Sequence, residues 1–304
     1  MLRSVLLYLS EQKRLQNFVL GSKFARKRSR RFVAGETLDE AIGAVRGLNA
    51  RGMDVTLDHL GECVESEDQA DKATDDYIRI LDRLAAESGV EATISIKPTQ
   101  IGLAIDRDLC LKNMRRLAES ASAQGNFVRM DMEASCYVDS TLSVFYELSD
   151  EFKNIGAVIQ SYLRRSEDDV RELSRRGAPV RLCKGAYKEP AQLAFQKKQE
   201  IDDSYVKLLE ILMDSDAPVG IATHDDLMID AGKRLIRARP DRKAHVEFQM
   251  LYGIRRDMQA RLVEERYGMR VYVPYGTEWY PYFMRRMAER PANLFFALRA
   301  MGGK

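Results

Sequence analysis

Residues 156–187 read GAVIQSYLRRSEDDVRELSRRGAPVRLCKGAY. Two short apolar runs, at 156–163 and 179–187, flank a charged segment that opens on Ser-Glu-Asp at 166–168. Short runs rich in β-branched residues indicate buried strands, and a serine followed by acidic residues is a typical helix start. The stretch therefore predicts one strand–helix–strand unit with its two strands parallel in the same sheet.

The same rhythm repeats along most of the chain. Eight strand-like runs occupy residues 53–60, 92–98, 126–133, 156–163, 179–187, 218–225, 245–251 and 270–276. Amphipathic segments that predict helices occupy residues 71–86, 108–122, 167–176, 191–213, 227–239 and 255–267. Eight alternating units in about 250 residues predict an α/β fold, a TIM-like (β/α)8 barrel. We expect residues 46–304 to form this barrel and residues 1–45 to form an N-terminal helical arm.

The composition excludes several other classes of protein. The 304 residues carry 48 Lys and Arg against 46 Asp and Glu, a net charge of +2, and 45% of them are hydrophobic. This balance indicates a folded chain and gives no general attraction for nucleic acid. The sequence has neither G-x-G-x-x-G nor G-x-x-x-x-G-K-[ST], which argues against Rossmann-type dinucleotide sites and P-loops.

The cysteines and the N-terminus indicate the cellular compartment of the protein. The four cysteines are far apart, without a C-x-x-C pair, and the three histidines lack metal-ligand spacing. We expect reduced thiols in the cytoplasm and no metal site. The apolar stretch at 5–9 is too short for a signal peptide or a membrane span. Six basic residues within 23–31 are a candidate patch for anionic lipid, with an ordinary solvated face as the simpler interpretation.

Polar side chains close the predicted strands. In a barrel of parallel strands the C-terminal ends meet on one face, where ligands bind. Charge within an apolar strand costs free energy unless it is paired or used, so these residues indicate a site. For Arg129 and Glu133 an internal salt-bridge network is an equal alternative, and for His59 we expect a structural role. The residues at strand ends are Asp58, His59, Lys97, Asp131, Glu133, Gln160, Arg181, Lys184, Thr223, His224, Asp225, Glu247, Gln249 and Tyr275.

The segment RLCKGAY at 181–187 suits an anion. It ends a strand with a cation and then turns on Gly185, where backbone N–H groups can approach a phosphate closely. A phosphate-bearing cofactor would fit this turn. The alternative is a tight strand–helix turn with Lys184 facing solvent.

The segment WYPYFMRRMAER at 279–290 suits a carboxylate. It follows the eighth predicted strand and so begins at the expected binding face. Arginine can hold a carboxylate through two parallel hydrogen bonds, which lysine cannot. The alternative is a surface helix in which Arg285 and Glu289, one turn apart, form an ion pair.

The chain resembles the proline dehydrogenase family in its bacterial, monofunctional form. Seven ordered pieces carry the resemblance: SIKP (95–98), RMDME (129–133), RLCKGAY (181–187), ATHD (222–225), FQMLYG (248–253), YG (275–276) and RR-x-x-E (285–289). The resemblance implies an FAD enzyme on a distorted (β/α)8 barrel. It implies hydride transfer from L-proline to FAD N5, which gives Δ1-pyrroline-5-carboxylate in the first step of proline catabolism to glutamate, with reoxidation by a quinone.

The resemblance also assigns roles to individual residues. It implies that Asp131 and Arg181 are catalytic, with Arg181 beside the isoalloxazine ring. The residues that it places on FAD are Met132, Gln160, Arg181, Lys184, Gly185, Ala186, Thr223 and His224. The residues that it places on the substrate are Lys97, Tyr187, Tyr275, Arg285, Arg286 and Glu289.

The sequence also predicts partners of the enzyme and leaves other functions open. We expect a separate pyrroline-5-carboxylate dehydrogenase for the second oxidation, because 304 residues leave no room for another catalytic module. Quinone insolubility and the basic residues predict peripheral contact with the inner face of the cytoplasmic membrane. Lys188 stands where related bifunctional enzymes have a tryptophan. Three other interpretations stay open: oxidation of another cyclic secondary amine such as hydroxyproline, a Schiff-base aldolase that uses Lys97 or Lys184, and a non-catalytic scaffold that binds a small acid.

Overall fold

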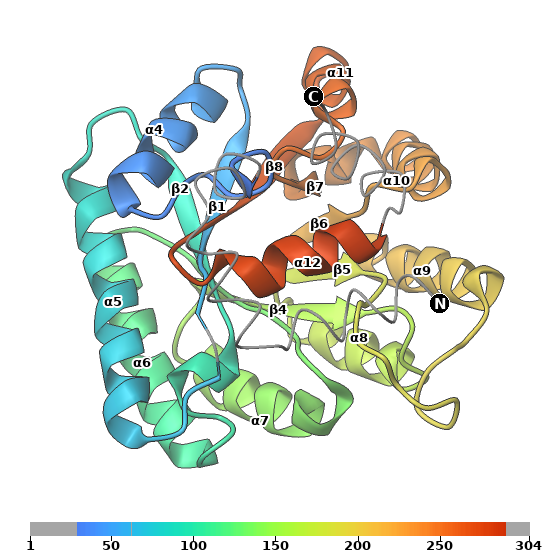
Figure 1. Cartoon of the computed structure of the whole chain (residues 1–304). Coiled ribbons are helices and arrows are strands. Elements are labelled where there is room, and N and C mark those ends of the chain that lie inside the picture. Colours follow the sequence, from blue (N-terminus) through green and yellow to red (C-terminus); the bar gives the residue numbers. More distant parts are fainter. Residues whose placement is uncertain (1–28, 62, 290–304) are drawn as a thin grey trace, which may run out of the picture.

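A computed structural model of the chain describes residues 29–61 and 63–289, with side chains up to residue 287. Its eight parallel strands form a closed barrel, in which each strand pairs with the next and the last pairs with the first (Figure 1). Each predicted run overlaps one strand, so the predicted (β/α)8 barrel is confirmed. The strands are β1 (Asp54–His59), β2 (Ala92–Ile96), β3 (Val128–Met130), β4 (Ile155–Gln160), β5 (Val180–Cys183), β6 (Val219–Ala222), β7 (Val246–Leu251) and β8 (Gly268–Tyr275).

Helices surround the barrel. They are α4 (Leu38–Asn49), α5 (Glu67–Ala86), α6 (Arg107–Ala123), α7 (Val138–Ser149), α8 (Ser166–Arg175), α9 (Lys198–Met213), α10 (Asp226–Ala238), α11 (Arg256–Glu264) and α12 (Trp279–Glu289). Short 3-10 helices occur at η1 (Pro98–Ile101), η2 (Ser135–Tyr137) and η3 (Pro240–His245). No helix of the described residues is long and apolar enough to cross a membrane.

One helix prediction needs correction, and one helix was not among the predicted segments. Helix α7 has no counterpart among the predicted segments, and the helix predicted from residue 191 begins only at Lys198. The segment before Lys198 is instead held against the turn after β4. There the Phe195 N–H donates to the Tyr162 carbonyl at 2.8 Å, and the Arg164 N–H donates to the Leu193 carbonyl at 2.9 Å. These loop contacts compete with helix formation.

Local sequence explains where several helices begin. Thr37 and Glu40 form a reciprocal capping box at the start of α4. Ser66 caps α5, and Asp225 caps α10, each by accepting a hydrogen bond from a backbone N–H of the first turn. Such caps satisfy N–H groups that have no partner inside the helix. The caps therefore fix where these helices begin.

Side chains alternate between the two faces of each strand. In β1, Val55 and Leu57 are buried in the apolar layer between barrel and helices, so Thr56 and Asp58 point into the barrel. Barrels of this type are usually filled by Val, Ile and Leu. Here the interior is strongly polar. Its polar side chains include Arg129, Arg181, Glu247, Gln249 and Arg270.

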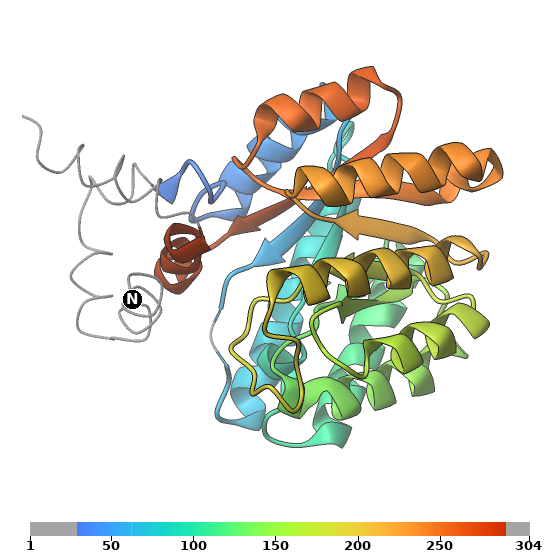
Figure 2. The same ribbon diagram turned by 90° about the vertical axis from the view of Figure 1, so that its right-hand side faces the viewer.

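The last helix departs from a regular barrel. Helix α12 lies across the C-terminal ends of the strands instead of packing outside β8 (Figures 1 and 2). Trp279 and Tyr280 of α12 are buried in a small apolar cluster with Phe32 and with Leu60, which directly follows β1. Trp279 Nε1 also donates to Glu36 Oε1 at 3.1 Å. This anchoring holds α12 at the C-terminal ends of the strands.

Helix α4 packs outside β1 and β8, where the eighth helix of a regular barrel would lie. Its buried residues are Ala41, Ile42, Val45 and Leu48. The predicted boundary at residue 45 falls inside this helix. Residues 1–28 of the predicted arm lie outside the described part of the chain.

Candidate active site

Four side chains meet inside the barrel. Arg181 of β5 donates from Nη1 to Asp131 Oδ1 at 2.7 Å and to Ser95 Oγ at 3.0 Å. Tyr272 of β8 donates its hydroxyl to Asp131 Oδ2 at 2.8 Å, and its ring centre lies 5.3 Å from the Arg181 guanidinium. Because β5 is adjacent to neither β2 nor β8, these bonds cross the interior. The structure thus brings together the two residues predicted as catalytic.

The pair of Arg181 and Asp131 is nearly removed from water, with 8% and 15% of the two side chains exposed. A buried ion pair persists only when its remaining donors and acceptors are also satisfied. Ser95 and Tyr272 meet this need, together with Gln249, whose Oε1 accepts from Arg181 Nε at 2.5 Å. Burial, reinforced by the Asp131 charge, raises the pKa of Tyr272 well above its ordinary value, so the hydroxyl keeps its proton.

Tyr272 is absent from the predicted site residues, which include Tyr275 instead. The Tyr275 ring stacks on His59 at a centroid distance of 5.1 Å, at the ends of β8 and β1. Residues three apart in a strand point to opposite faces, so only one of the two tyrosines can enter the barrel. Counting alternate positions from Arg270, whose side chain lies in the interior, identifies Tyr272.

A second buried ion pair lies at the end of β1 and β2. Lys97 Nζ is 3.0 and 3.2 Å from the two carboxylate oxygens of Asp58. Only 19% of the Lys97 side chain and 1% of the Asp58 side chain is exposed. Burial alone lowers the pKa of Lys97, but the charges of Asp58 and Asp131 outweigh it and raise the pKa above the ordinary 10.5. Lys97 is therefore a fixed positive charge beside the central cluster.

Glu133 and Arg129 have separate partners. Glu133 accepts from the backbone N–H of Thr99 at 3.0 Å and from its hydroxyl at 2.7 Å. Arg129 donates to the carbonyls of Ala157 at 3.2 Å and Pro179 at 2.7 Å. Burial raises the pKa of Glu133 and lowers that of Arg129 to about 9. Both residues tie neighbouring parts of the barrel together.

The residues predicted to hold a cofactor lie along one edge, after β3 to β6. Gln160 donates from Nε2 to the Met132 carbonyl at 3.3 Å. Its Oε1 is buried and has no hydrogen-bond partner within the described residues. Gly185 has a φ of +101°, and a Cβ there would lie 2.2 Å from the Tyr162 ring. Only glycine can form this turn, after which Ala186 is exposed.

Lys184, Thr223 and His224 extend this edge. Lys184 Nζ pairs with Asp225 at 2.8 Å and also with Asp202, so carboxylates hold it in place. Thr223 Oγ1 accepts from the Asp225 N–H at 3.1 Å. His224 Nε2 accepts from a backbone N–H of β7 at 2.9 Å, which leaves its ring proton on Nδ1. The edge thus carries a cation and two fixed polar side chains.

The residues predicted to hold a carboxylate lie on α12 and in the loop after β5. The Arg286 guanidinium is 5.1 Å from the centre of the Tyr282 ring. Tyr187 is 42% exposed. Partial burial of its hydroxyl raises the pKa of Tyr187, Glu133 adds to this shift, and Arg285 opposes it. Arg285 therefore lies within electrostatic reach of Tyr187. The Glu289 side chain lies outside the described part of the chain.

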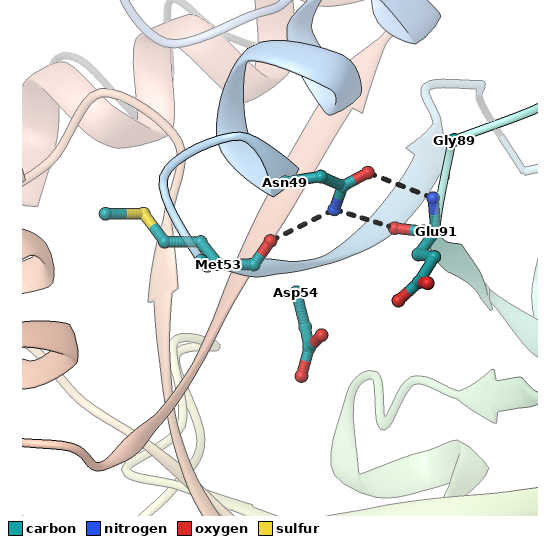
Figure 3. A pocket seen from close by; sticks show the side chains of 6 residues that line it. Asn49, Met53, Asp54, Gly89 and Glu91 are labelled. Carbon is teal, nitrogen blue, oxygen red and sulfur yellow. Dashed lines mark hydrogen bonds between the residues drawn. The ribbon is translucent and has the colours of Figure 1, made fainter.

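A polar depression on the opposite face is separate from this cluster (Figure 3). Asn49 donates to the carbonyls of Met53 at 3.0 Å and Glu91 at 3.1 Å, and accepts from the Glu91 N–H at 2.9 Å. It thereby joins the end of α4 to the starts of β1 and β2. The N-terminal face of a barrel serves stability, and these bonds fit that role. The lining residues are Asn49, Gly52, Met53, Asp54, Gly89 and Glu91.

Comparison with known proteins identifies the family of the chain. The family model for proline dehydrogenase matches residues 41–298. Proline dehydrogenase 1 of Bacillus subtilis is 40% identical over 303 residues, 99% of each chain. Proline dehydrogenase of Deinococcus radiodurans is 41% identical over 276 residues, 89% of each chain. The crystal structure of proline utilization A from Bdellovibrio bacteriovorus has a TM-score of 0.80 at 25% identity, covering 94% of this chain and 38% of that one. The chain belongs to the proline dehydrogenase family.

Proposed function

We propose that this protein oxidises L-proline to Δ1-pyrroline-5-carboxylate with FAD, as the first step of proline catabolism. The observation that carries the proposal is the buried cluster of Arg181, Asp131 and Tyr272 inside the barrel. Family membership supports the same reaction. FAD, when bound, accepts the hydride that leaves the carbon next to the proline nitrogen.

FAD fits the edge after β3 to β6. The buried Gln160 Oε1 offers an acceptor that the described residues do not fill, and Gly185 keeps the neighbouring turn free of a side chain. Lys184 supplies a positive charge for the phosphates. Arg181 is on β5, the strand that leads to Lys184 and Gly185, and its positive charge would stabilise negative charge on a bound cofactor. The remaining residues assigned to this edge are Met132, Ala186, Thr223 and His224.

The substrate carboxylate is assigned to Lys97, Arg285 and Arg286. Proline is a small zwitterion, and a cationic clamp on its carboxylate turns the other end of the ring toward the cofactor. The pocket is completed by Tyr187, Tyr275 and Glu289. The amine must lose its proton before hydride can leave. We assign control of that proton to the network of Lys97, Asp131 and Glu289.

The site disfavours the lysine-aldolase alternative. A Schiff-base lysine must be neutral to attack a carbonyl, which requires a lowered pKa. The pKa of Lys97 is raised, because the carboxylates around it outweigh the effect of burial. Lys184 is held between Asp202 and Asp225. Both lysines are therefore placed to act as charges.

We assign reoxidation to a quinone, and the second oxidation to a separate pyrroline-5-carboxylate dehydrogenase. We place the protein in the cytoplasm, with peripheral contact at the inner membrane face. Residues 23–28 of the basic cluster lie outside the described part of the chain, and Arg30 is paired with Glu40. Flotation with anionic vesicles at low salt tests this contact. Protein that stays with the non-floating fraction would remove the membrane assignment.

Proline-dependent reduction of a soluble quinone tests the proposed function. We expect turnover with L-proline and a product that a pyrroline-5-carboxylate dehydrogenase consumes. Arg286→Lys should raise KM for proline about tenfold at unchanged FAD content, because lysine keeps the charge but loses the planar fork. Arg256→Lys is the matched control, since Arg256 also lies over a tyrosine, at 5.7 Å from the Tyr252 ring, but on α11. Equal KM values in the two variants would contradict the carboxylate assignment.

A further inference from the structure

Gln249 of β7 makes a contact to Arg181 that the proposed reaction leaves unexplained. Its Oε1 accepts from Arg181 Nε at 2.5 Å, and its Nε2 donates to Glu247 Oε1 at 2.6 Å. Arg270 Nε donates to the same Glu247 oxygen at 2.6 Å. Gln249 is only 4% exposed. A continuous chain of hydrogen bonds therefore runs through the interior from Arg181 to Arg270.

The chemistry of the two partners fixes the orientation of the Gln249 amide. A guanidinium only donates hydrogen bonds and a carboxylate only accepts them. The amide oxygen must therefore face Arg181, and the amide nitrogen must face Glu247. A carboxylate at position 249 would face the carboxylate of Glu247, and an apolar side chain would leave both neighbours unsatisfied. Only an uncharged side chain with one donor and one acceptor meets both needs.

A glycine on the neighbouring strand makes room for this amide. Gly220 of β6 pairs in register with Glu247. Its backbone is not among the positive-φ glycines, so the conformation itself does not require glycine. A Cβ at Gly220 would lie 2.4 Å from Gln249 Nε2 and 2.7 Å from its Cδ. Glycine weakens a strand, and the space that the amide occupies explains its presence here.

The charges along this chain are separated. Among the described residues Arg181 has one carboxylate partner, Asp131, and its Nε partner is the neutral Gln249 amide. The negative charge of Glu247 is paired with Arg270 instead. The amide therefore fixes the Nε side of the Arg181 guanidinium without adding a second negative charge next to it.

We propose that Gln249 is a positioning residue for Arg181, which holds the guanidinium against the cofactor edge with its positive charge preserved. This inference rests on the proposed function, in which Arg181 stabilises negative charge on the cofactor. Gly220 and Glu247 support the position of the amide. Loss of the amide contact should therefore change the cofactor more than it changes proline binding.

Two variants test this contact from opposite sides. Gln249→Leu removes the acceptor, and Gly220→Ala forces the amide away from its place. Thr56→Val is the matched control, because the Thr56 hydroxyl is buried in the same interior, 2.9 Å from that of Thr93, without touching Arg181. For each purified holoenzyme we would measure FAD content, melting temperature, the reduction potential of the flavin by dye equilibrium, and kcat and KM for proline.

We expect both test variants to disfavour flavin reduction by about tenfold, a shift of about 30 mV to lower potential for two electrons. We expect kcat to fall about tenfold, less than the ~10²–10³ lost with a direct donor, while KM changes little. The control should lose thermal stability without a shift in potential. This contrast separates positioning from a purely structural role.

Potentials in both test variants equal to that of the control would overturn the positioning role, even if all proteins were less stable. In that case a wild-type flavin that proline still reduces would leave the proposed function standing. If the wild-type flavin takes electrons from the dye but not from proline, the proposed function is refuted. The reduction potentials of the variants would still test the role of Gln249. Protein that cannot be reconstituted with FAD would overturn both.

Discussion

Removal of Asp58 tests the electrostatics of the site rim. Asp58→Ala leaves the Lys97 ammonium without the carboxylate 3.0 Å away, in a place where only 19% of its side chain is exposed. At an effective dielectric constant of ~20, two unit charges at this distance attract by about 5 kcal/mol. Part of that attraction offsets the cost of burial, so we expect a loss of ~3–5 kcal/mol in the free energy of unfolding.

Urea unfolding followed by circular dichroism measures this loss. Asp39→Ala is the control, because Asp39 pairs with Arg83 at 3.1 Å at the surface, where 82% of the Asp39 side chain is exposed. Such a pair contributes ~0–1 kcal/mol. Because the pKa of Lys97 is higher in the folded protein, the ion pair contributes its full stabilisation below the unfolded pKa of 10.5. That contribution is lost only as the pH rises through the higher pKa of the folded state. The stabilisation that the pair gives to the wild type should therefore be the same at pH 7 and pH 9.

The double variant Asp58→Ala/Lys97→Met separates an unpaired charge from a simple loss of packing. We expect it to be more stable than Asp58→Ala alone, because no uncompensated charge then stays buried. The reasoning would be refuted if Asp58→Ala cost no more than Asp39→Ala, or if the second change lowered stability further.

Three further changes probe other parts of the site. Tyr272→Phe should cost ~1.5–3 kcal/mol in urea unfolding, because it removes a buried hydrogen bond to a carboxylate, and an unchanged midpoint would argue against that bond. At Asp225, hydrogen bonds from two lysines outweigh burial and lower the pKa from 3.8 to about 2. Above pH 4 the free energy of unfolding of the wild type should therefore exceed that of Asp225→Asn by about 2 kcal/mol, and this difference should largely disappear as the pH falls to 2. A difference that does not change with pH would contradict the ion pairs. Gly185→Ala should cost ~1–3 kcal/mol in thermal unfolding, because φ is +101° and Tyr162 blocks the new methyl group. Gly177→Ala is the control and should cost less, because Gly177 has φ +64° and open space around it. Equal losses of stability in the two variants would contradict the close approach of Gly185 to Tyr162.

The barrel was predictable from the sequence because apolar residues recur with a different period in strands and in helices. Runs such as 156–163 and 218–225 are short, apolar and bounded by turn signals, and each contains or overlaps a strand. The position of α12 was not predictable in this way. Its amphipathic pattern shows which face is apolar, but not that this face packs on Phe32 and Leu60 across the barrel opening. Contacts between segments so far apart in the chain leave no local signal.

The site was predictable at the level of strand ends rather than of individual contacts. Asp131 and Arg181 were identified and do meet. Tyr272 was missed, although strand alternation from Arg270 points to it. The two carboxylates that hold Lys184 could not be foreseen, because Asp202 lies in α9 and Asp225 precedes α10. Such pairings depend on how helices dock on the barrel.

The visible spectrum of the purified protein, recorded without oxygen before and after addition of L-proline, tests the central claim most directly. The account predicts an oxidised flavin spectrum that bleaches when proline is added and is restored by a soluble quinone. A yellow protein that stays oxidised in the presence of proline would contradict the proposed substrate. A colourless protein that cannot be reconstituted with FAD would contradict the cofactor as well.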